Sequence, residues 1–284
     1  MLIDIGANLT HESFAPDFDQ VLTRAREAGV LQMIVTGASR AGSQQASAMA
    51  QLHDQLYATV GIHPHHAEET SNLTLTELEE LAKQPKVVAI GETGLDFFRD
   101  FSPREIQITS FESHLELANR IGLPLFLHER DSYPVFKDIL RAHRDDLCRK
   151  VVHCFTGQKT ALYSYLDLDC YIGITGWICD ERRGEHLLEL VKDIPESRLM
   201  IETDAPYLMP RNIRPKPKSR RNEPMYLPVI AEKVAECRGV SAAEIVELTT
   251  ANATEFFSLK RSDNSISYFL LPWAAISASR PCYS

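Results

Sequence analysis

Four side chains suited to metal binding or acid–base chemistry each follow a short run of apolar residues. Glu92 comes after V-V-A-I-G, His128 after P-L-F-L, His153 after V-V, and Asp204 shortly after L-M-I. Uninterrupted apolar runs of this kind are typical of strands buried on both faces. Parallel strands of α/β folds place the residues at their carboxyl ends on one face, where active sites lie. We therefore expect these four side chains to converge.

Histidines and carboxylates that meet at one strand edge are suited to a divalent cation. A single histidine is more often a core or surface residue, but here the same pattern ends several buried strands. We therefore predict that Glu92, His128 and His153 bind a metal ion. For Glu92, the alternative is a solvated carboxylate that only ends its strand.

Asp204 is the predicted catalytic residue. A divalent metal lowers the pKa of a bound water to about 7. A carboxylate that takes a proton from that water can raise the rate by about 10² to 10⁴. The alternatives are that Asp204 is a further metal ligand or that it caps the loop that follows.

Two more histidines follow the predicted strand over residues 56–61, in the motif G-I-H-P-H. We predict that His63 and His65 contact the substrate, either by binding a phosphate group or by lining the rim of the pocket. Pro64 lies between them and restricts the local backbone.

A basic loop follows the last predicted strand. Six of the eleven residues from 211 to 221 are cationic: Arg211, Arg214, Lys216, Lys218, Arg220 and Arg221. Loops at the carboxyl end of a barrel form its active site, and cations there would bind an anionic polymer backbone. We predict that Arg211, Arg220 and Arg221 bind substrate. A solvated charge cluster is the alternative for any one of them.

Three aromatic residues lie near these candidates in the sequence. Phe97 and Phe98 come shortly after Glu92, and Trp177 follows a predicted strand over residues 170–175. Exposed rings at this face would stack on nucleic-acid bases. Packing inside the protein is the alternative, and it is favoured for at least one of the two phenylalanines.

Eight short apolar segments alternate with helical patterns along the chain. Strands are predicted over residues 1–8, 30–36, 56–61, 86–91, 124–127, 151–152, 170–175 and 198–201, and helices over 16–28, 40–53, 73–82, 103–121, 132–143, 159–168 and 181–191. This alternation implies a parallel sheet, and eight such units predict an α/β fold of the closed (β/α)8 TIM-barrel type. Two further helices follow the basic loop, and a capping box of Ser241 and Glu244 begins the second.

The length of the chain suits one barrel domain, which we assign to residues 1–257. Residues 258–284 form an atypical serine-rich tail that we expect to be docked or disordered. The net charge of −9 at pH 7 excludes a non-specific nucleic-acid coat. Six cysteines without a C-x-x-C pair, no signal-like amino terminus and no apolar run of 18 residues predict a cytoplasmic protein without a membrane partner. Nothing indicates an obligate protein partner, so we expect a monomer.

The segments A-I-G-E-T-G-L-D-F, P-L-F-L-H, V-V-H-C-F-T-G, Y-I-G-I-T-G and I-E-T-D-A-P together resemble the TatD family of metal-dependent deoxyribonucleases. The resemblance covers residues 4 to about 257, and G-W-I-C-D-E-R-R-G and S-R-R-N-E-P are similar to its bacterial TatD branch. It implies an amidohydrolase-like barrel that hydrolyses phosphodiesters with Mg²⁺. For this branch it implies 3′-to-5′ exonuclease action on single-stranded DNA and RNA, with a role in DNA repair. It also implies that Glu92, His128 and His153 are the metal ligands, and Asp204 matches the aspartate of strand eight.

One segment departs from the wider family. Most members begin with D-x-H-x-H, which provides two histidine ligands on strand one, whereas this chain reads D-I-G-A-N from Asp4 to Asn8. Since neither Gly6 nor Asn8 supplies an imidazole, one ion site of a two-metal centre is missing or is held only by substrate and water. Mg²⁺ prefers oxygen ligands, so Mn²⁺ would suit the remaining imidazoles better. The TatD branch shares this departure, which therefore does not indicate lost activity.

Two other functions fit the same residues. A barrel hydrolase acting on a small amide, lactone or phosphoester stays open because the altered strand changes the metal centre, although the basic loop argues against it. A non-catalytic metal-binding or nucleic-acid-binding protein is disfavoured by the complete set of one Glu, two His and one Asp. Metal binding without turnover of any phosphodiester would favour that third function.

Overall fold

The structure is a computed structural model that describes residues 1–147 and 149–260. Most of the segment predicted to be a tail, from residue 261 onward, lies outside this part of the chain. Among the described helices, none is both long and apolar enough to cross a membrane.

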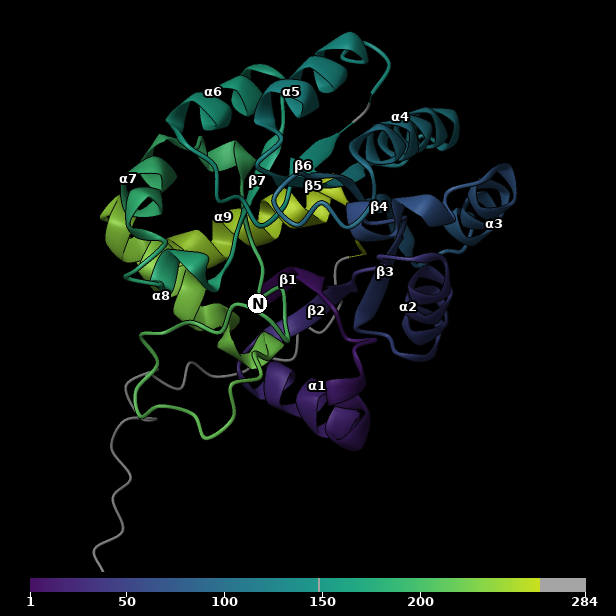
Figure 1. The fold of residues 1–284 in the computed structure, drawn as a ribbon. Coiled ribbons are helices and arrows are strands. Elements are labelled where there is room, and N and C mark those ends of the chain that lie inside the picture. The colour runs from purple at the N-terminus through teal and green to yellow at the C-terminus, as the bar shows by residue number, and fades with distance from the viewer. Residues whose placement is uncertain (148, 261–284) are drawn as a thin grey trace, which may run out of the picture.

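Eight parallel strands form one sheet in the order of the chain, and each strand pairs with the next (Figure 1). The strands are β1 (Leu2–Ala7), β2 (Val30–Val35), β3 (Leu56–Val60), β4 (Val87–Asp96), β5 (Leu125–Arg130), β6 (Lys150–Val152), β7 (Tyr171–Ile174) and β8 (Leu199–Ile201). Their apolar residues are buried on both faces, as expected for strands covered by helices outside and packed side chains inside.

The first and last strands meet and complete the barrel. A parallel bridge joins Ala7 to Ala205, and the Asn8 N–H donates to the Ala205 carbonyl oxygen at 2.7 Å. The fully buried carboxylate of Asp4 accepts a hydrogen bond from the Thr203 N–H at 2.9 Å and another from the Thr203 hydroxyl. These contacts, with the order of the sheet, confirm the predicted (β/α)8 barrel.

Helices surround the strands (Figure 1). Seven of them each lie between one strand and the next: α1 (Phe18–Glu27), α2 (Arg40–Leu52), α3 (Asn72–Ala82), α4 (Arg104–Ile121), α5 (Tyr133–Ala142), α6 (Lys159–Asp167) and α7 (Glu185–Asp193). Two more, α8 (Leu227–Arg238) and α9 (Ala242–Phe256), follow β8, and α9 begins with the predicted capping box of Ser241 and Glu244. Short 3₁₀ helices are η1 (Glu12–Asp17), η2 (Pro64–Glu69), η3 (Gly176–Cys179), η4 (Glu196–Arg198) and η5 (Pro224–Tyr226).

The amino-terminal end of the barrel is filled by apolar side chains. Phe126, Val151 and Met200 belong to one buried cluster inside the barrel, and Phe256 at the end of α9 packs on it. The Phe256 ring lies 5.0 Å from the ring of Tyr171. Glu92, His128 and His153 lie at the other, carboxyl end of the barrel.

Several predicted boundaries differ from the structure, and the differences are largest at the end of β4 and the start of α7. The strand predicted to end at residue 91 continues as β4 to Asp96, so Glu92 lies within a strand. The helix predicted from residue 181 begins only at Glu185. Its first residues are instead held in a turn, because the Asp180 carboxylate accepts a hydrogen bond from the Arg182 N–H at 3.0 Å.

Candidate metal centre and active site

Glu92 lies at the centre of a histidine cluster at the carboxyl end of the barrel. Its Oε1 atom is 2.7 Å from His153 Nε2, 3.0 Å from His128 Nδ1 and 3.4 Å from His63 Nε2. Glu92 belongs to β4 and His128 to β5, whereas His63 and His153 follow β3 and β6. The structure thus brings together the three residues predicted as ligands and adds His63 to them.

The backbone before Glu92 requires glycine. Gly91 has a φ of 142°, a conformation that residues with a side chain rarely adopt, and a Cβ atom there would collide with the carbonyl oxygen of Phe126 in β5. The Glu92 N–H donates to the Gly37 carbonyl oxygen at 2.8 Å. These contacts bring β4 close to β5 and fix the direction of the Glu92 carboxylate.

The donor atoms of this cluster suit a divalent metal ion. One ligand atom each from His63, Glu92 and His128 lies within 4.8 Å of the other two. The Nε2 atom of His128 is shielded from solvent and forms no hydrogen bond with the residues described, since the nearest carboxylate, that of Asp96, is 3.5 Å away. A buried polar atom without a partner is unfavourable, and a metal–nitrogen bond removes that penalty. His153 lies beside this group, and its role as a ligand stays a prediction.

Burial and mutual attraction set the pKa values in the cluster. Burial alone would raise the pKa of Glu92, but the charges of His63 and His153 and hydrogen bonds from the histidines hold it well below its ordinary value. Burial lowers the pKa of His63 well below its ordinary value, against the attraction of Glu92. Burial acts likewise on His153, but Glu92 and Glu202 raise its pKa well above the ordinary value. An ionised Glu92 and a neutral His63 are the forms that bind metals.

Asp96, which the sequence analysis missed, extends the site from the end of β4. Its Oδ2 atom lies 2.8 Å from His65 Nε2 and 3.5 Å from His128 Nε2. Burial would raise the pKa of Asp96, but these histidines and a backbone hydrogen bond from Arg99 keep it below its ordinary range. Residues two apart in a strand share a face, so the spacing of Glu92 and Asp96 was a signal that could have identified Asp96.

Glu202, which was not among the predicted site residues, contacts His153 and the residue after it. Its Oε1 atom accepts a hydrogen bond from the Cys154 N–H at 2.6 Å, and its Oε2 atom is 3.4 Å from His153 Nδ1. A Cβ atom at Gly6 would collide with Glu202 Oε2, and one at Gly173 would lie 2.6 Å from Oε1. Glu202 therefore fills the space into which a side chain at position 6 would project. This explains why glycine stands where the D-x-H-x-H pattern has its first histidine.

Asp204, the predicted catalytic residue, follows β8 and is held by the other residue that departs from that pattern. The Asn8 side-chain amide donates to Asp204 Oδ1 at 2.9 Å. Burial raises the pKa of Asp204 to about 7, with His153 opposing the rise and Glu92 adding to it. A carboxyl group with a pKa near 7 can both accept and release a proton at neutral pH.

Some cations of the basic loop line a pocket, whereas Arg221 forms ion pairs within the protein. Arg221 forms ion pairs with Asp17 at 2.7 Å and Glu223 at 2.8 Å, so its guanidinium is engaged internally. Arg211 pairs with an exposed glutamate at 3.0 Å. Arg220 has no carboxylate within 4.0 Å in the described part of the chain, and it lines a pocket of about 660 Å³ together with Arg211.

Arginines alternate with aromatic rings at the carboxyl ends of β4, β5 and β7. The guanidinium carbon of Arg130 lies 5.2 Å from the ring centre of Trp177 and 4.8 Å from that of Phe98. Arg183 lies 4.4 Å from the Trp177 ring, and Arg99 lies 5.6 Å from the Phe98 ring, which is itself exposed. We call these five residues the Arg–aromatic row. Cation–π contacts order the rings and keep charge beside them.

Relatives of known name match almost the whole chain. A family profile described as TatD related DNase matches residues 3–258. The protein named 3′-5′ ssDNA/RNA exonuclease TatD from Erwinia tasmaniensis is 50% identical over 259 residues, which cover 91% of this chain and 100% of that protein. The protein of the same name from Shigella flexneri serotype 5b is 45% identical over 258 residues, which cover 91% and 99%.

Solved structures agree with this result. YJJV, a TatD homologue from Escherichia coli, superposes with a TM-score of 0.83 at 29% identity and covers 91% of this chain and 98% of its own. A TatD family hydrolase from Entamoeba histolytica gives 0.82 at 30% identity, with 90% and 97% covered. An N-acetyl-D-glucosamine-6-phosphate deacetylase from Mycobacterium smegmatis, 12% identical with a TM-score of 0.56 over 91% of this chain and 77% of its own, shares the fold alone. The chain belongs to the family of TatD-related DNases.

Proposed function

We propose that this protein is a metal-dependent exonuclease that removes nucleotides from the 3′ end of single-stranded DNA and RNA. The observation that carries the proposal is the cluster of His63, Glu92 and His128, in a chain half identical to a protein named for that activity. The proposed ion is Mg²⁺, and Mn²⁺ would suit the imidazoles better. The proposal includes action as a cytoplasmic monomer and a role in DNA repair.

The protein's own residues divide the chemistry between them. A bound divalent metal would polarise a phosphate oxygen and lower the pKa of a water molecule. Since Asn8 occupies Oδ1 of Asp204, the Oδ2 atom takes the proton from the attacking water. Glu202 lies next to Nδ1 of His153 and orients that ring so that Nε2 faces Glu92.

The nucleic-acid strand has two kinds of partner at this end of the barrel. Arg211 and Arg220 in the basic loop bind its phosphates. The Arg–aromatic row stacks on its bases, since ring faces accept any base. Arg221 contributes by fixing the loop to Asp17 and Glu223 rather than by touching the strand.

The test is cleavage of 5′-labelled and 3′-labelled single-stranded DNA and RNA with Mg²⁺, with Mn²⁺ and with a chelator. We expect stepwise loss of 3′ nucleotides that the chelator stops. His128→Ala and Asp204→Asn should keep the circular dichroism spectrum of the parent but lose cleavage. The control Lys83→Met, a change of an exposed residue, should keep cleavage. Full activity in folded Asp204→Asn would contradict the role of Asp204. A folded parent protein without cleavage under any metal would favour the small-substrate hydrolase.

A further inference from the structure

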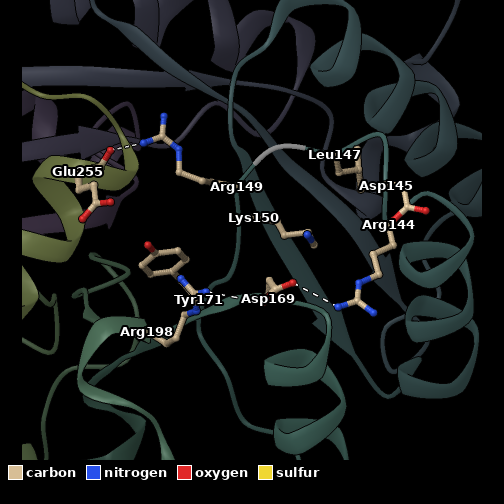
Figure 2. Close-up of a pocket in the computed structure, with 9 residues that line it drawn as sticks. All are labelled: Arg144, Asp145, Leu147, Arg149, Lys150, Asp169, Tyr171, Arg198 and Glu255. Carbon is tan, nitrogen blue, oxygen red and sulfur yellow. Dashed lines mark hydrogen bonds and ion pairs between the residues drawn. The ribbon is translucent and has the colours of Figure 1, made fainter.

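A second pocket lies at the end of the barrel opposite the metal centre (Figure 2). It has a volume of about 670 Å³. Its wall includes Lys150 at the start of β6, Tyr171 at the start of β7 and Arg198 just before β8. His153 of the metal centre lies beyond the other end of β6, about 10 Å along the strand. This pocket and the metal centre therefore lie at opposite ends of the same strand.

Lys150 is the unusual residue of this pocket. The residue is only 3% exposed. In residues 1–147 and 149–260, no carboxylate oxygen lies within 4.0 Å of its ammonium group, and no acceptor forms a hydrogen bond with it. Its nitrogen is not fully shielded from solvent, and it opens onto the pocket without a partner among the described residues. An anion held in the pocket would supply the partner that Lys150 lacks.

The neighbouring cations point to the same kind of ligand. Arg149 donates to the backbone carbonyl of Glu255 and, at 3.2 Å, to the Ser258 hydroxyl, and among the described residues it forms no ion pair. Figure 2 shows the Arg149 side chain directed toward Glu255, whereas the neighbouring Lys150 side chain points in another direction. Arg149 and Lys150 therefore both lack a carboxylate partner in the described part of the chain.

The other charged residues of the lining are Arg144, Arg198, Asp145, Asp169 and Glu255, so the whole lining has four cations and three carboxylates, a net charge of +1. Arg144 and Arg198 both lie near the Asp169 carboxylate, at 3.4 Å and 3.7 Å. The guanidinium of Arg198 also lies 4.8 Å from the ring centre of Tyr171. The site thus combines guanidinium donors, an unpaired ammonium group and an aromatic wall. Multiply charged oxyanions suit such donors better than a single carboxylate does.

We propose that this pocket binds a small phosphate-bearing anion, with the Lys150 ammonium group as its central contact and Arg149 beside it. Inorganic phosphate and a 5′-mononucleotide share the required group, and the volume of the pocket accommodates either. The proposal does not depend on the exonuclease function, because none of its residues belongs to the metal centre.

Isothermal titration calorimetry of the full chain with inorganic phosphate, and separately with thymidine 5′-monophosphate, tests the proposal. A chelator keeps metal-dependent binding out of the measurement. We expect saturable binding to the parent protein and to Glu92→Gln, and binding at least tenfold weaker to Lys150→Met. The matched control Lys192→Met removes an exposed lysine of α7 that pairs with Glu189, and it should bind as the parent does. Tighter binding of the nucleotide than of phosphate would identify a mononucleotide site, and the reverse would identify a phosphate site.

The stability of the variants separates lost binding from lost folding. Because the Lys150 ammonium group forms no ion pair with the described residues, the melting temperature of Lys150→Met, without phosphate, should equal or exceed that of the parent. Phosphate should then raise the melting temperature of the parent and not that of the variant. Arg149→Met is the second variant if Lys150→Met does not fold, and it should also weaken binding. Absence of binding to the parent, or equal binding to the parent and the folded lysine variant, would overturn the proposal.

Discussion

His114 links the acid stability of the barrel to the position of His63. The ring of His114 is fully buried in α4, where its Nε2 atom accepts a hydrogen bond from the Ile62 N–H at 3.1 Å. Its Nδ1 atom donates to the Ser110 carbonyl oxygen at 2.7 Å. Both bonds are possible only for the neutral ring, since a protonated ring has no acceptor. Burial accordingly lowers the pKa of His114 from 6.5 to about 4.

The effect of His114 on the free energy of unfolding follows from the difference between its pKa in the folded and unfolded states. Between pH 6.5 and 4, His114 is protonated in the unfolded state and neutral in the folded state. The free energy of unfolding therefore falls as the pH falls. The contribution is fully present above pH 6.5 and is lost progressively down to about pH 4. A difference of about 2.5 between the two pKa values corresponds to about 3 kcal/mol. Protonation of His114 would also break its bond to the residue that precedes His63.

Urea unfolding at pH values from 4 to 7.5, with a chelator present, measures this effect for the parent and for His114→Gln. The glutamine retains an acceptor for the Ile62 N–H but does not titrate. We expect the parent to lose about 3 kcal/mol more than the variant between pH 7 and pH 4, because all other titrating groups are common to both. Parallel curves for the two proteins would refute the reasoning, since they would show that His114 titrates alike in both states.

Three further predictions concern the surroundings of the metal centre. Gly6→Ala should lower the free energy of unfolding by about 1 to 3 kcal/mol, measured by urea denaturation, because the added methyl group collides with the Glu202 carboxylate; an unchanged midpoint would show that the carboxylate has room to move. Glu202→Gln should weaken Mn²⁺ binding by about 10-fold to 100-fold in calorimetry, because His153 loses the charge that orients it; an unchanged affinity would exclude that role. Arg221→Ala should lower stability by about 2 kcal/mol and leave the salt dependence of DNA binding unaltered, whereas Arg220→Ala should leave stability unaltered and reduce the salt slope by about 1; the opposite pattern would show that Arg221 contacts the strand.

The convergence of the ligands could be predicted because it depends on local signals. Each of Glu92, His128 and His153 belongs to or follows a run of apolar residues, and parallel strands must bring the ends of such runs together. The barrel could be predicted for the same reason, because the alternation of strands and helices is also a local signal. The predicted roles of these residues, unlike their placement, await the experiments above.

The partners of several residues could not be predicted, because they depend on contacts between distant parts of the chain. Arg221 looked like its neighbours in the basic loop, yet its partner Asp17 is 204 positions away. Glu202 sits beside Asp204 in the sequence, but its contact with Gly6 appears only when β1 and β8 meet. Asp96 was not predicted because β4 continues beyond Gly91, where the strand was expected to end.

The hydrogen bond between Asp4 and Thr203 has a consequence for folding during synthesis. Its partners are 199 positions apart, so β1 leaves the ribosome long before the strand that completes it has been made. Until then its outer edge is an open template for association with other chains, and pairing over such distances is slow. An ionised carboxylate on β1 would lose its hydration without gaining a partner if an apolar strand docked on it, which is unfavourable. We therefore expect the side chain that contacts Thr203 in the folded barrel also to disfavour association of β1 with other chains before β8 is made.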